Sequence, residues 1–417
     1  MALTSTSILS RFRRGGPGGI DLTLRPAYRD RRAKLGDPHT KIPPVFHVAG
    51  TNGKGSVCAF LRAILEAAGY KVHVYTSPHL VTFHERIRIA GNLISEDELV
   101  AILNECERLA APGSITYFEA ATAAAFAAFA RHRADFTILE TGLGGRLDAT
   151  NIIEKPLATL ITRLSCDHRE YLGNTLADLA REKAGIMRAG VPCFTIPQPD
   201  GESLETLRTC ATAIGALLHI VDPVKFPGVI LALSGKHQWE NANLAVAALD
   251  ALPSPLPANA ITHGLQNAEW PARLQKLDSG ALRDLLPTNW ELWLDGGHND
   301  SAGEVLAAQA RAWQSENPAL PLHLIIGMIT TKNPAEFLAP LAPYITSLHS
   351  IAIPGEAQSF TAEALAQQAR DLKIPHVTAA ENIQQALARL ANEKSPSRIL
   401  IGGSLYLAGD VLRLNQA

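Results

Sequence analysis

Short apolar runs alternate with amphipathic stretches along most of this chain. The first run, residues 45–49, has the length of a buried strand, and residues 56–68 then carry apolar side chains at helical spacing. The alternation continues almost to the C-terminus, which predicts an α/β fold with a parallel sheet covered by helices on both faces. The next predicted strands are 71–76, 136–139, 157–161 and 191–195, and the next predicted helices begin at 95, 118 and 175.

The alternation is interrupted between Trp270 and Asn289, where proline and glycine recur and the periodicity is weak. The chain has 417 residues, which is long for one compact core, so we expect two domains. We place a P-loop ATPase domain at residues 1–275 and a smaller, Rossmann-like α/β domain at residues 276–417. The strands predicted for the second domain are 291–294, 322–326, 348–353 and 398–401, with helices from 301, after 333, around 365 and 383, and from 404.

Composition excludes several classes of partner. Hydrophobic residues make up 47% of the chain, charged residues 19%, and the net charge is -2, so we expect neither a nucleic-acid nor a membrane partner. The five cysteines are scattered without a C-x-x-C pair, which favours a reducing cytoplasm over a disulfide framework. No apolar stretch reaches transmembrane length, and residues 1–19 predict a frayed basic N-terminus.

A glycine-rich loop separates the first predicted strand from the first helix. The order of strand, glycine loop, lysine, hydroxyl and helix places backbone N–H groups around a phosphate. The spacing departs from an ordinary Walker A motif, because Gly55 separates Lys54 from Ser56 and Val48 occupies the position of the first glycine. A nucleotide site with its own loop variant is therefore favoured over a generic P-loop kinase or switch. The loop reads Gly50-Thr51-Asn52-Gly53-Lys54-Gly55-Ser56.

Other polar residues follow predicted strands at the same edge of the sheet. Glu140 ends one buried strand and opens a glycine-rich loop, where a carboxylate can hold a metal on bound phosphates. Asp167 and His168 follow the next strand, although a lone histidine is more often a surface group. Taken alone, Lys183 reads as a solvated helix lysine, and residues 295–299 read as a glycine turn.

Taken together, these motifs make the chain resemble the folylpolyglutamate synthase and dihydrofolate synthase family within the Mur-ligase superfamily. The matching stretches occur in family order and span nearly the whole chain. They are His47–Ser56, Thr76–Leu80 with His84–Ile89, Glu140–Asn151, Asp167–His168 with Arg181–Ile186, His237–Ala242, Trp270–Gln275, Asp295–Asn299 and Gly403–Gly409.

The resemblance implies an ATP-dependent carboxylate–amine ligase. A folate carboxylate would attack the γ-phosphate of ATP, and the amine of L-glutamate would then displace phosphate from the acyl phosphate. The acceptors implied are dihydropteroate, which gives dihydrofolate, and reduced folyl-(poly)glutamates. A synthase limited to folylpolyglutamates and, less favoured, a cell-wall Mur-type ligase stay open as alternatives. A P-loop switch ATPase is a rival from another class, and it would hydrolyse ATP without either co-substrate.

The same resemblance implies roles for individual residues, with ATP held between the domains and a monomeric enzyme. The implied catalytic residues are Lys54, His168 and Lys183, and the lysine at 183 would be carbamylated. The implied nucleotide contacts are Gly50, Thr51, Asn52, Gly53, Lys54, Gly55, Ser56, Asn241, Arg273, Asp295 and His298. The implied ligands of magnesium, for which two ions are expected, are Ser56, Ser77, Glu140, His168 and Lys183. The implied pterin contacts are Thr116, Tyr117, Phe118, Leu147, Asp148 and Ala149.

Three motifs depart from the family pattern, and the last two of them put fine positioning by the second domain in doubt. Ala272 replaces the glycine of W-P-G-R, and residues 295–300 read D-G-G-H-N-D where the family has D-G-A-H-N-P. An acidic loop centred on a lysine reads Thr331-Lys332-Asn333 here.

Overall fold

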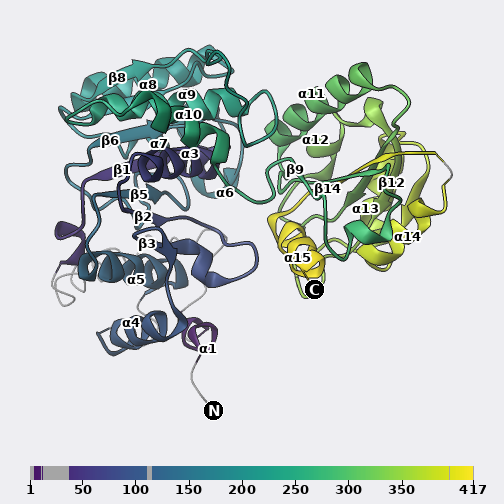
Figure 1. Cartoon of the computed structure of the whole chain (residues 1–417), viewed down its shortest axis with the longest axis horizontal. Helices are drawn as coiled ribbons and strands as arrows, with labels where there is room; N and C mark the ends of the chain where they lie inside the picture. Colours follow the sequence, from purple (N-terminus) through teal and green to yellow (C-terminus); the bar gives the residue numbers. More distant parts are fainter. Residues whose placement is uncertain (1–3, 11, 13–36, 110–114, 394, 417) are drawn as a thin grey trace. The chain divides into compact units, whose positions relative to one another are not determined.

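The computed structural model describes residues 4–10, 12, 37–109, 115–393 and 395–416. The chain divides into two units, each described by itself (Figure 1). The first unit joins residues 1–232 with 238–269, and the second joins 233–237 with 270–417. Most of the predicted basic N-terminus, including Arg11, Arg13 and Arg14, lies outside the described residues.

The first unit is built on an eight-stranded sheet in the order β4-β3-β2-β5-β1-β6-β7-β8. All neighbouring strands are parallel except at one edge, where β2 pairs with β3, and β3 with β4, in antiparallel fashion. The sequence did not predict this edge, because β3 and β4 are only three and two residues long. The strands are β1 (Val45–Ala49), β2 (Val72–Tyr75), β3 (Ile87–Ile89), β4 (Asn92–Leu93), β5 (Phe136–Glu140), β6 (Ala158–Ile161), β7 (Pro192–Thr195) and β8 (Leu217–Ile220).

Helices of the first unit gather in groups around this sheet (Figure 1). Helices α3, α9 and α10 pack together, α1, α4 and α5 form another group, and α7 packs on α8. Thr116 and Thr175 cap α5 and α7 through reciprocal side-chain and backbone hydrogen bonds. The helices are α1 (Ser5–Leu9), α3 (Lys54–Ala67), α4 (Glu96–Leu109), α5 (Tyr117–Arg131), α6 (Arg169–Leu172), α7 (Leu176–Ala184), α8 (Gly201–Ile214), α9 (Gln238–Ala248) and α10 (Ala258–Asn267), with the 3-10 turns η2 (Pro38–Thr40), η3 (Phe83–Arg86) and η4 (Leu249–Ala251).

The second unit contains a six-stranded sheet in the order β13-β12-β11-β14-β10-β9. Only β9 runs antiparallel, where it pairs with β10. Residues 270–275, which the sequence placed in the first domain, belong to this second unit. The strands are β9 (Gln275–Lys276), β10 (Glu291–Leu294), β11 (Leu322–Ile326), β12 (Ile345–Ser350), β13 (Val377–Ala379) and β14 (Arg398–Gly402). The helices are α11 (Asp300–Glu316), α12 (Pro334–Leu338), α13 (Ala362–Asp371), α14 (Ile383–Ala391) and α15 (Leu405–Gln416), with the turns η5 (Arg283–Leu285) and η6 (Ala342–Tyr344).

Each unit buries its own apolar core. One cluster in the first unit lies among α1, α4, α5 and the adjoining strands, and one in the second unit surrounds β11. Among the described residues, no helix has the length and apolar character needed to cross a bilayer. All five cysteines are free thiols.

Candidate functional site

The glycine loop follows β1 and leads into α3, which begins at Lys54. Gly50 and Gly53 have φ values of +146° and +93°. A Cβ on Gly50 would lie 1.8 Å from Thr162 Oγ1, and one on Gly53 would lie 2.3 Å from Asn241 Oδ1. Both positions therefore need glycine for conformation and for space. The approach also places Asn241, a predicted nucleotide contact on α9, directly against the loop.

The segment after β6 holds this loop in place. Backbone N–H groups of Thr51 and Asn52 donate to the carbonyl oxygen of Arg163 at 3.0 and 3.2 Å. The Arg163 guanidinium in turn pairs with Glu240 of α9, with the shortest nitrogen–oxygen distance at 2.8 Å. These supporting residues were not predicted from the sequence. Their one visible signal is position, since Arg163 follows a buried strand at the edge where ligands bind in parallel sheets.

Two lysine side chains meet at the backbone of this loop. Lys54 Nζ donates to the carbonyl oxygens of Gly50 and Thr51 at 3.1 and 3.2 Å. Lys183 Nζ donates to the same Gly50 oxygen at 2.9 Å. Lys183 is 4% exposed, so its interpretation as a solvated helix lysine is wrong. Burial, with a smaller effect from the Lys54 charge, lowers the pKa of Lys183 to about 7.

Oxygen donors for a hard metal ion lie beside the loop. Ser56 Oγ, in the first turn of α3, is buried and has no hydrogen-bond partner among the residues that the structure describes. The Glu140 carboxylate, which is 4% exposed, accepts a hydrogen bond from Ser77 N at 3.1 Å. His168 is the N-cap of α6, and its Nε2 lies 3.9 Å from Asp167 Oδ1. Within the described parts of the chain, no three His, Cys, Asp or Glu side chains group as a metal site.

The two stretches predicted to contact a pterin come together. A Cβ on Gly142 would lie 2.3 Å from Phe118 Cζ, so the Phe118 ring rests directly on the glycine-rich loop. The Thr116 hydroxyl takes part in the cap of α5. Tyr117, Leu147 and Ala149 are half-buried. These residues therefore occupy one region, while their contact with a ligand stays a prediction.

Asp148 organises the same loop through a buried hydrogen-bond network. Its Oδ2 accepts from the N–H groups of Gly142 and Leu143, both at 2.9 Å, and its Oδ1 accepts from the Thr150 hydroxyl at 2.6 Å. Because Thr150 donates there, His47 Nε2, 2.9 Å from the same hydroxyl, is the donor to Thr150. Burial lowers the pKa of His47 to about 3, so the ring is neutral. His47 and Thr150 therefore hold Asp148 in place, a role that was not predicted from the sequence.

In the second unit, the predicted nucleotide contacts also come together. Asp295 is buried, and its carboxylate accepts from Leu274 N at 2.8 Å and Gly297 N at 2.7 Å. Burial raises the pKa of Asp295, and the nearby Arg273 charge opposes that rise. His298 Nδ1 lies 2.9 Å from the carbonyl oxygen of Gly296. Contact between these side chains and a nucleotide stays a prediction.

Ala272, which replaces the family glycine, adopts φ +55°. This left-handed conformation is one that glycine adopts freely, which explains the usual residue at this position. The substitution therefore changes local backbone strain and removes no polar group.

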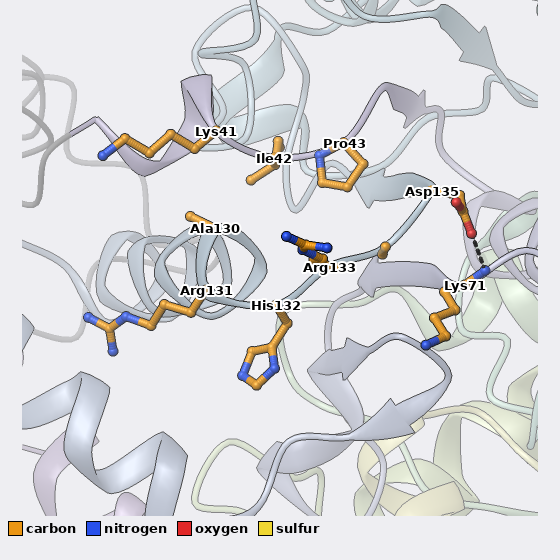
Figure 2. A pocket seen from close by; sticks show the side chains of 10 residues that line it. Lys41, Ile42, Pro43, Lys71, Ala130, Arg131, His132, Arg133 and Asp135 are labelled. Carbon is orange, nitrogen blue, oxygen red and sulfur yellow. Dashed lines mark hydrogen bonds between the residues drawn. The ribbon is translucent and has the colours of Figure 1, made fainter.

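A cavity of about 640 Å³ lies at the N-terminal ends of the strands of the first sheet, opposite the glycine loop (Figure 2). Its lining includes Pro43, Lys71 and Asp135, which precede β1, β2 and β5, and the Lys71 N–H donates to the Asp135 carboxylate at 2.7 Å. Figure 2 shows the Arg133 guanidinium directed toward Ile42 and Pro43. None of the predicted site residues lines this cavity.

Comparison with known proteins matches both halves of the chain. The Mur ligase middle domain family matches residues 48–208, and the family described as dihydrofolate synthetase, C-terminal domain, matches residues 278–414. The chain is 34% identical over 415 residues to the dihydrofolate synthase/folylpolyglutamate synthase of Bacillus subtilis (strain 168), covering 91% of this chain and 92% of that protein.

Two solved structures are also similar. The structure of E. coli FolC in complex with DHPP and ADP has a TM-score of 0.84 at 31% identity, covering 99% of this chain and 97% of that one. The bifunctional folylpolyglutamate synthase/dihydrofolate synthase of Yersinia pestis, complexed with AMPPNP and Mn ion, has a TM-score of 0.79 at 29% identity, covering 93% and 92%.

The packing of the glycine loop leads to a prediction about stability. Gly53→Ala should destabilise the protein by about 1–3 kcal/mol more than Gly69→Ala, because only the first methyl group meets Asn241. The two glycines have nearly equal φ values, +93° and +89°, so backbone strain is matched. Denaturant unfolding measures the difference, and Asn241→Ala should recover part of it in the double variant. Equal losses from the two single variants would contradict the close packing.

Proposed function

This chain belongs to the dihydrofolate synthase/folylpolyglutamate synthase family, and from that premise we propose that it joins L-glutamate to folate-type carboxylates using ATP. The single observation that carries the proposal is the convergence of Lys54 and Lys183 on the Gly50 carbonyl oxygen, at the start of α3. This arrangement supports transfer of a phosphoryl group to a carboxylate, because it sets positive charge and backbone donors where phosphates bind.

The loop residues would bind and orient ATP. Free N–H groups in the first turn of α3, at Lys54, Gly55 and Ser56, favour phosphate oxygens, and the Lys54 ammonium neutralises their charge. Asn241 packs on Gly53 and would limit where the rest of the nucleotide lies. With ATP fixed, the acceptor carboxylate attacks the γ-phosphorus, and ADP leaves. The glutamate amine then attacks the acyl carbonyl carbon, phosphate leaves, and an amide remains.

The donor set fits magnesium. The unpartnered buried hydroxyl of Ser56 and the buried carboxylate of Glu140 are the hard oxygen ligands that this ion prefers. Ser77 and His168 complete the proposed set, together with a modified Lys183. When bound, magnesium would offset negative charge on the phosphates. The Yersinia relative was solved with AMPPNP and Mn ion, which supports a divalent metal beside the nucleotide.

We also propose that Lys183 is carbamylated. Its amine is buried beside Lys54, and a pKa of about 7 leaves much of it neutral near neutral pH. A neutral amine can attack the carbon of CO2, forming a C–N bond and releasing one proton. The product carries a negative charge, so it would relieve the repulsion between the two lysines and add an oxygen ligand for magnesium.

The proposed acceptors are dihydropteroate and reduced folyl-(poly)glutamates. The packing of Phe118 on the loop that Asp148 organises provides an aromatic face near a carboxylate, which suits a flat pterin ring. The proposal includes the predicted nucleotide role of Arg273, Asp295 and His298, glutamate binding by residues 276–417 and a monomeric enzyme. Five free cysteines support the proposed cytoplasmic location.

Product analysis with two acceptors tests the proposed function. The purified protein with ATP, magnesium and L-glutamate should form dihydrofolate from dihydropteroate and should also extend tetrahydrofolate. Activity on tetrahydrofolate alone would reduce the protein to the single-function synthase. ATP hydrolysis that proceeds equally without acceptor and glutamate would indicate a switch-type ATPase and overturn the ligase assignment.

Glu140→Gln should raise the magnesium concentration needed for half-maximal turnover by about 10-fold or more, because an amide oxygen replaces a charged ligand. A magnesium titration of ADP release measures the shift. Glu66→Gln, on the same helix as the loop lysine, is the control for loss of one carboxylate and should leave the titration unchanged. The same titration of His168→Ala tests whether His168 is a magnesium ligand. Unchanged curves for both Glu140→Gln and His168→Ala would contradict the proposed metal site.

Carbamylation of Lys183 can be observed without measuring activity. After equilibration with 13C-labelled bicarbonate at pH 8, the 13C NMR spectrum should show a carbamate signal that Lys183→Ala lacks and Lys54→Ala keeps. The signal should fade as the pH falls below about 7, because the buried amine then takes up a proton and cannot attack CO2. A spectrum without this signal across the range would leave Lys183 an unmodified cation.

A further inference from the structure

One buried guanidinium near the proposed folate site has no anionic partner within the part of the chain that the structure describes. Arg86 ends η3 and is 8% exposed, yet no ion pair joins it to a described carboxylate. The adjacent Glu85 cannot serve, because its carboxylate accepts hydrogen bonds from the N–H groups of residues 80–82. Burying an uncompensated charge is costly, so such a group usually meets a ligand or a counter-ion.

The Arg86 side chain is held in a fixed orientation. Its Nε donates to His79 Nδ1 at 2.8 Å, and its two terminal nitrogens have no hydrogen-bond partner among the described residues. Burial lowers the pKa of His79 to about 4, so the ring is a neutral acceptor. The guanidinium carbon lies 5.5 Å from the ring centroid of Phe83 and 5.7 Å from that of Tyr117. The two ring centroids lie only 6.0 Å apart, so the rings are neighbours beside the guanidinium, and these aromatic contacts favour a planar cation there.

This guanidinium belongs to the region where the two predicted pterin stretches meet. Tyr117 precedes Phe118, and the Phe118 centroid lies 6.2 Å from that of Tyr75. The charges of both Arg86 and Asp148 reach the Tyr75 hydroxyl, whose pKa burial raises, with Arg86 opposing that rise and Asp148 adding to it. A planar donor and a carboxylate therefore lie around one set of aromatic rings.

We propose that Arg86 is a specificity-determining residue that donates its terminal N–H groups to the acceptor edge of the pterin ring. The inference rests on the proposed function and deepens it. In a 7,8-dihydropterin the exocyclic oxygen on C4 and the imine nitrogen N5 are adjacent acceptors, which match the two-pronged guanidinium. In a tetrahydropterin N5 carries a hydrogen, so only the oxygen accepts. Arg86 therefore favours dihydropteroate over tetrahydrofolate.

Steady-state kinetics of Arg86→Met with both acceptors test this assignment. The KM for dihydropteroate should rise on the order of 10-fold or more, and the KM for tetrahydrofolate by clearly less, because the second substrate loses one hydrogen bond fewer. Arg86→Lys keeps the charge without the planar pair of donors, so it should show the same order of effects. Arg88→Met removes an equal charge two residues away, where the side chain donates to the Gly91 carbonyl oxygen. This control variant should leave the KM for both acceptors unchanged.

Two outcomes overturn the assignment. Equal increases in KM for both acceptors would show that Arg86 does not sense N5. A larger increase for tetrahydrofolate would place the guanidinium on a glutamyl carboxylate, which dihydropteroate lacks. Thermal unfolding verifies folding, and Arg86→Lys carries the test if Arg86→Met is unstable.

Failure of the proposed function would be distinguishable from failure of this inference. If the wild-type protein ligates glutamate to neither acceptor, the proposed function is overturned. In that case, dihydropteroate binding, measured by the quenching of protein fluorescence, would still test the role of Arg86. Equal affinities of the wild-type protein and the Arg86→Lys variant for dihydropteroate would then reject the proposed pair of hydrogen bonds.

Discussion

The carbonyl oxygen of Gly50 accepts hydrogen bonds from two lysine ammonium groups, and the proposed chemistry depends on that shared contact. The contact exists because the loop presses against its neighbours with no room for a Cβ at Gly50 or Gly53. Close approach brings α7, the source of Lys183, to the beginning of α3. The ammonium groups of Lys54 and Lys183 repel each other at this one carbonyl oxygen, so the site favours a bound anion or the neutral form of one lysine.

The same edge of the first sheet collects the other proposed groups. Strands β1, β5 and β6 are adjacent and parallel, so the residues that follow them meet at one edge. The glycine loop follows β1, Glu140 is the last residue of β5, and Arg163 follows β6. Topology therefore places the candidate chemistry, and the half-buried ion pair of Arg163 with Glu240 supports the glycine loop.

Much of the fold and part of the site could be predicted from local patterns. The predicted strand 45–49 and the strand ending at Glu140 match β1 and β5, and the Thr175 cap begins α7 as expected. Non-local packing explains the misses. Nothing near Lys183 in the sequence indicates that it is buried against Gly50, and the short antiparallel edge β3–β4 carries too few residues for a period. The stretch His84–Ile89 belongs to the family pattern, but the burial of Arg86 could not be predicted, because its aromatic neighbour Tyr117 comes from a helix distant in sequence.

The most direct test of the account follows an oxygen atom through the reaction. Dihydropteroate labelled with 18O in both carboxylate oxygens would be converted in the presence of ATP, magnesium and L-glutamate, and the released phosphate analysed by mass spectrometry. If the carboxylate attacks the γ-phosphorus, each phosphate released in forming the amide carries one 18O, because the acyl oxygen leaves with it. Phosphate without label, formed together with amide product, would contradict the acyl-phosphate route and the role proposed for the loop and its two lysines.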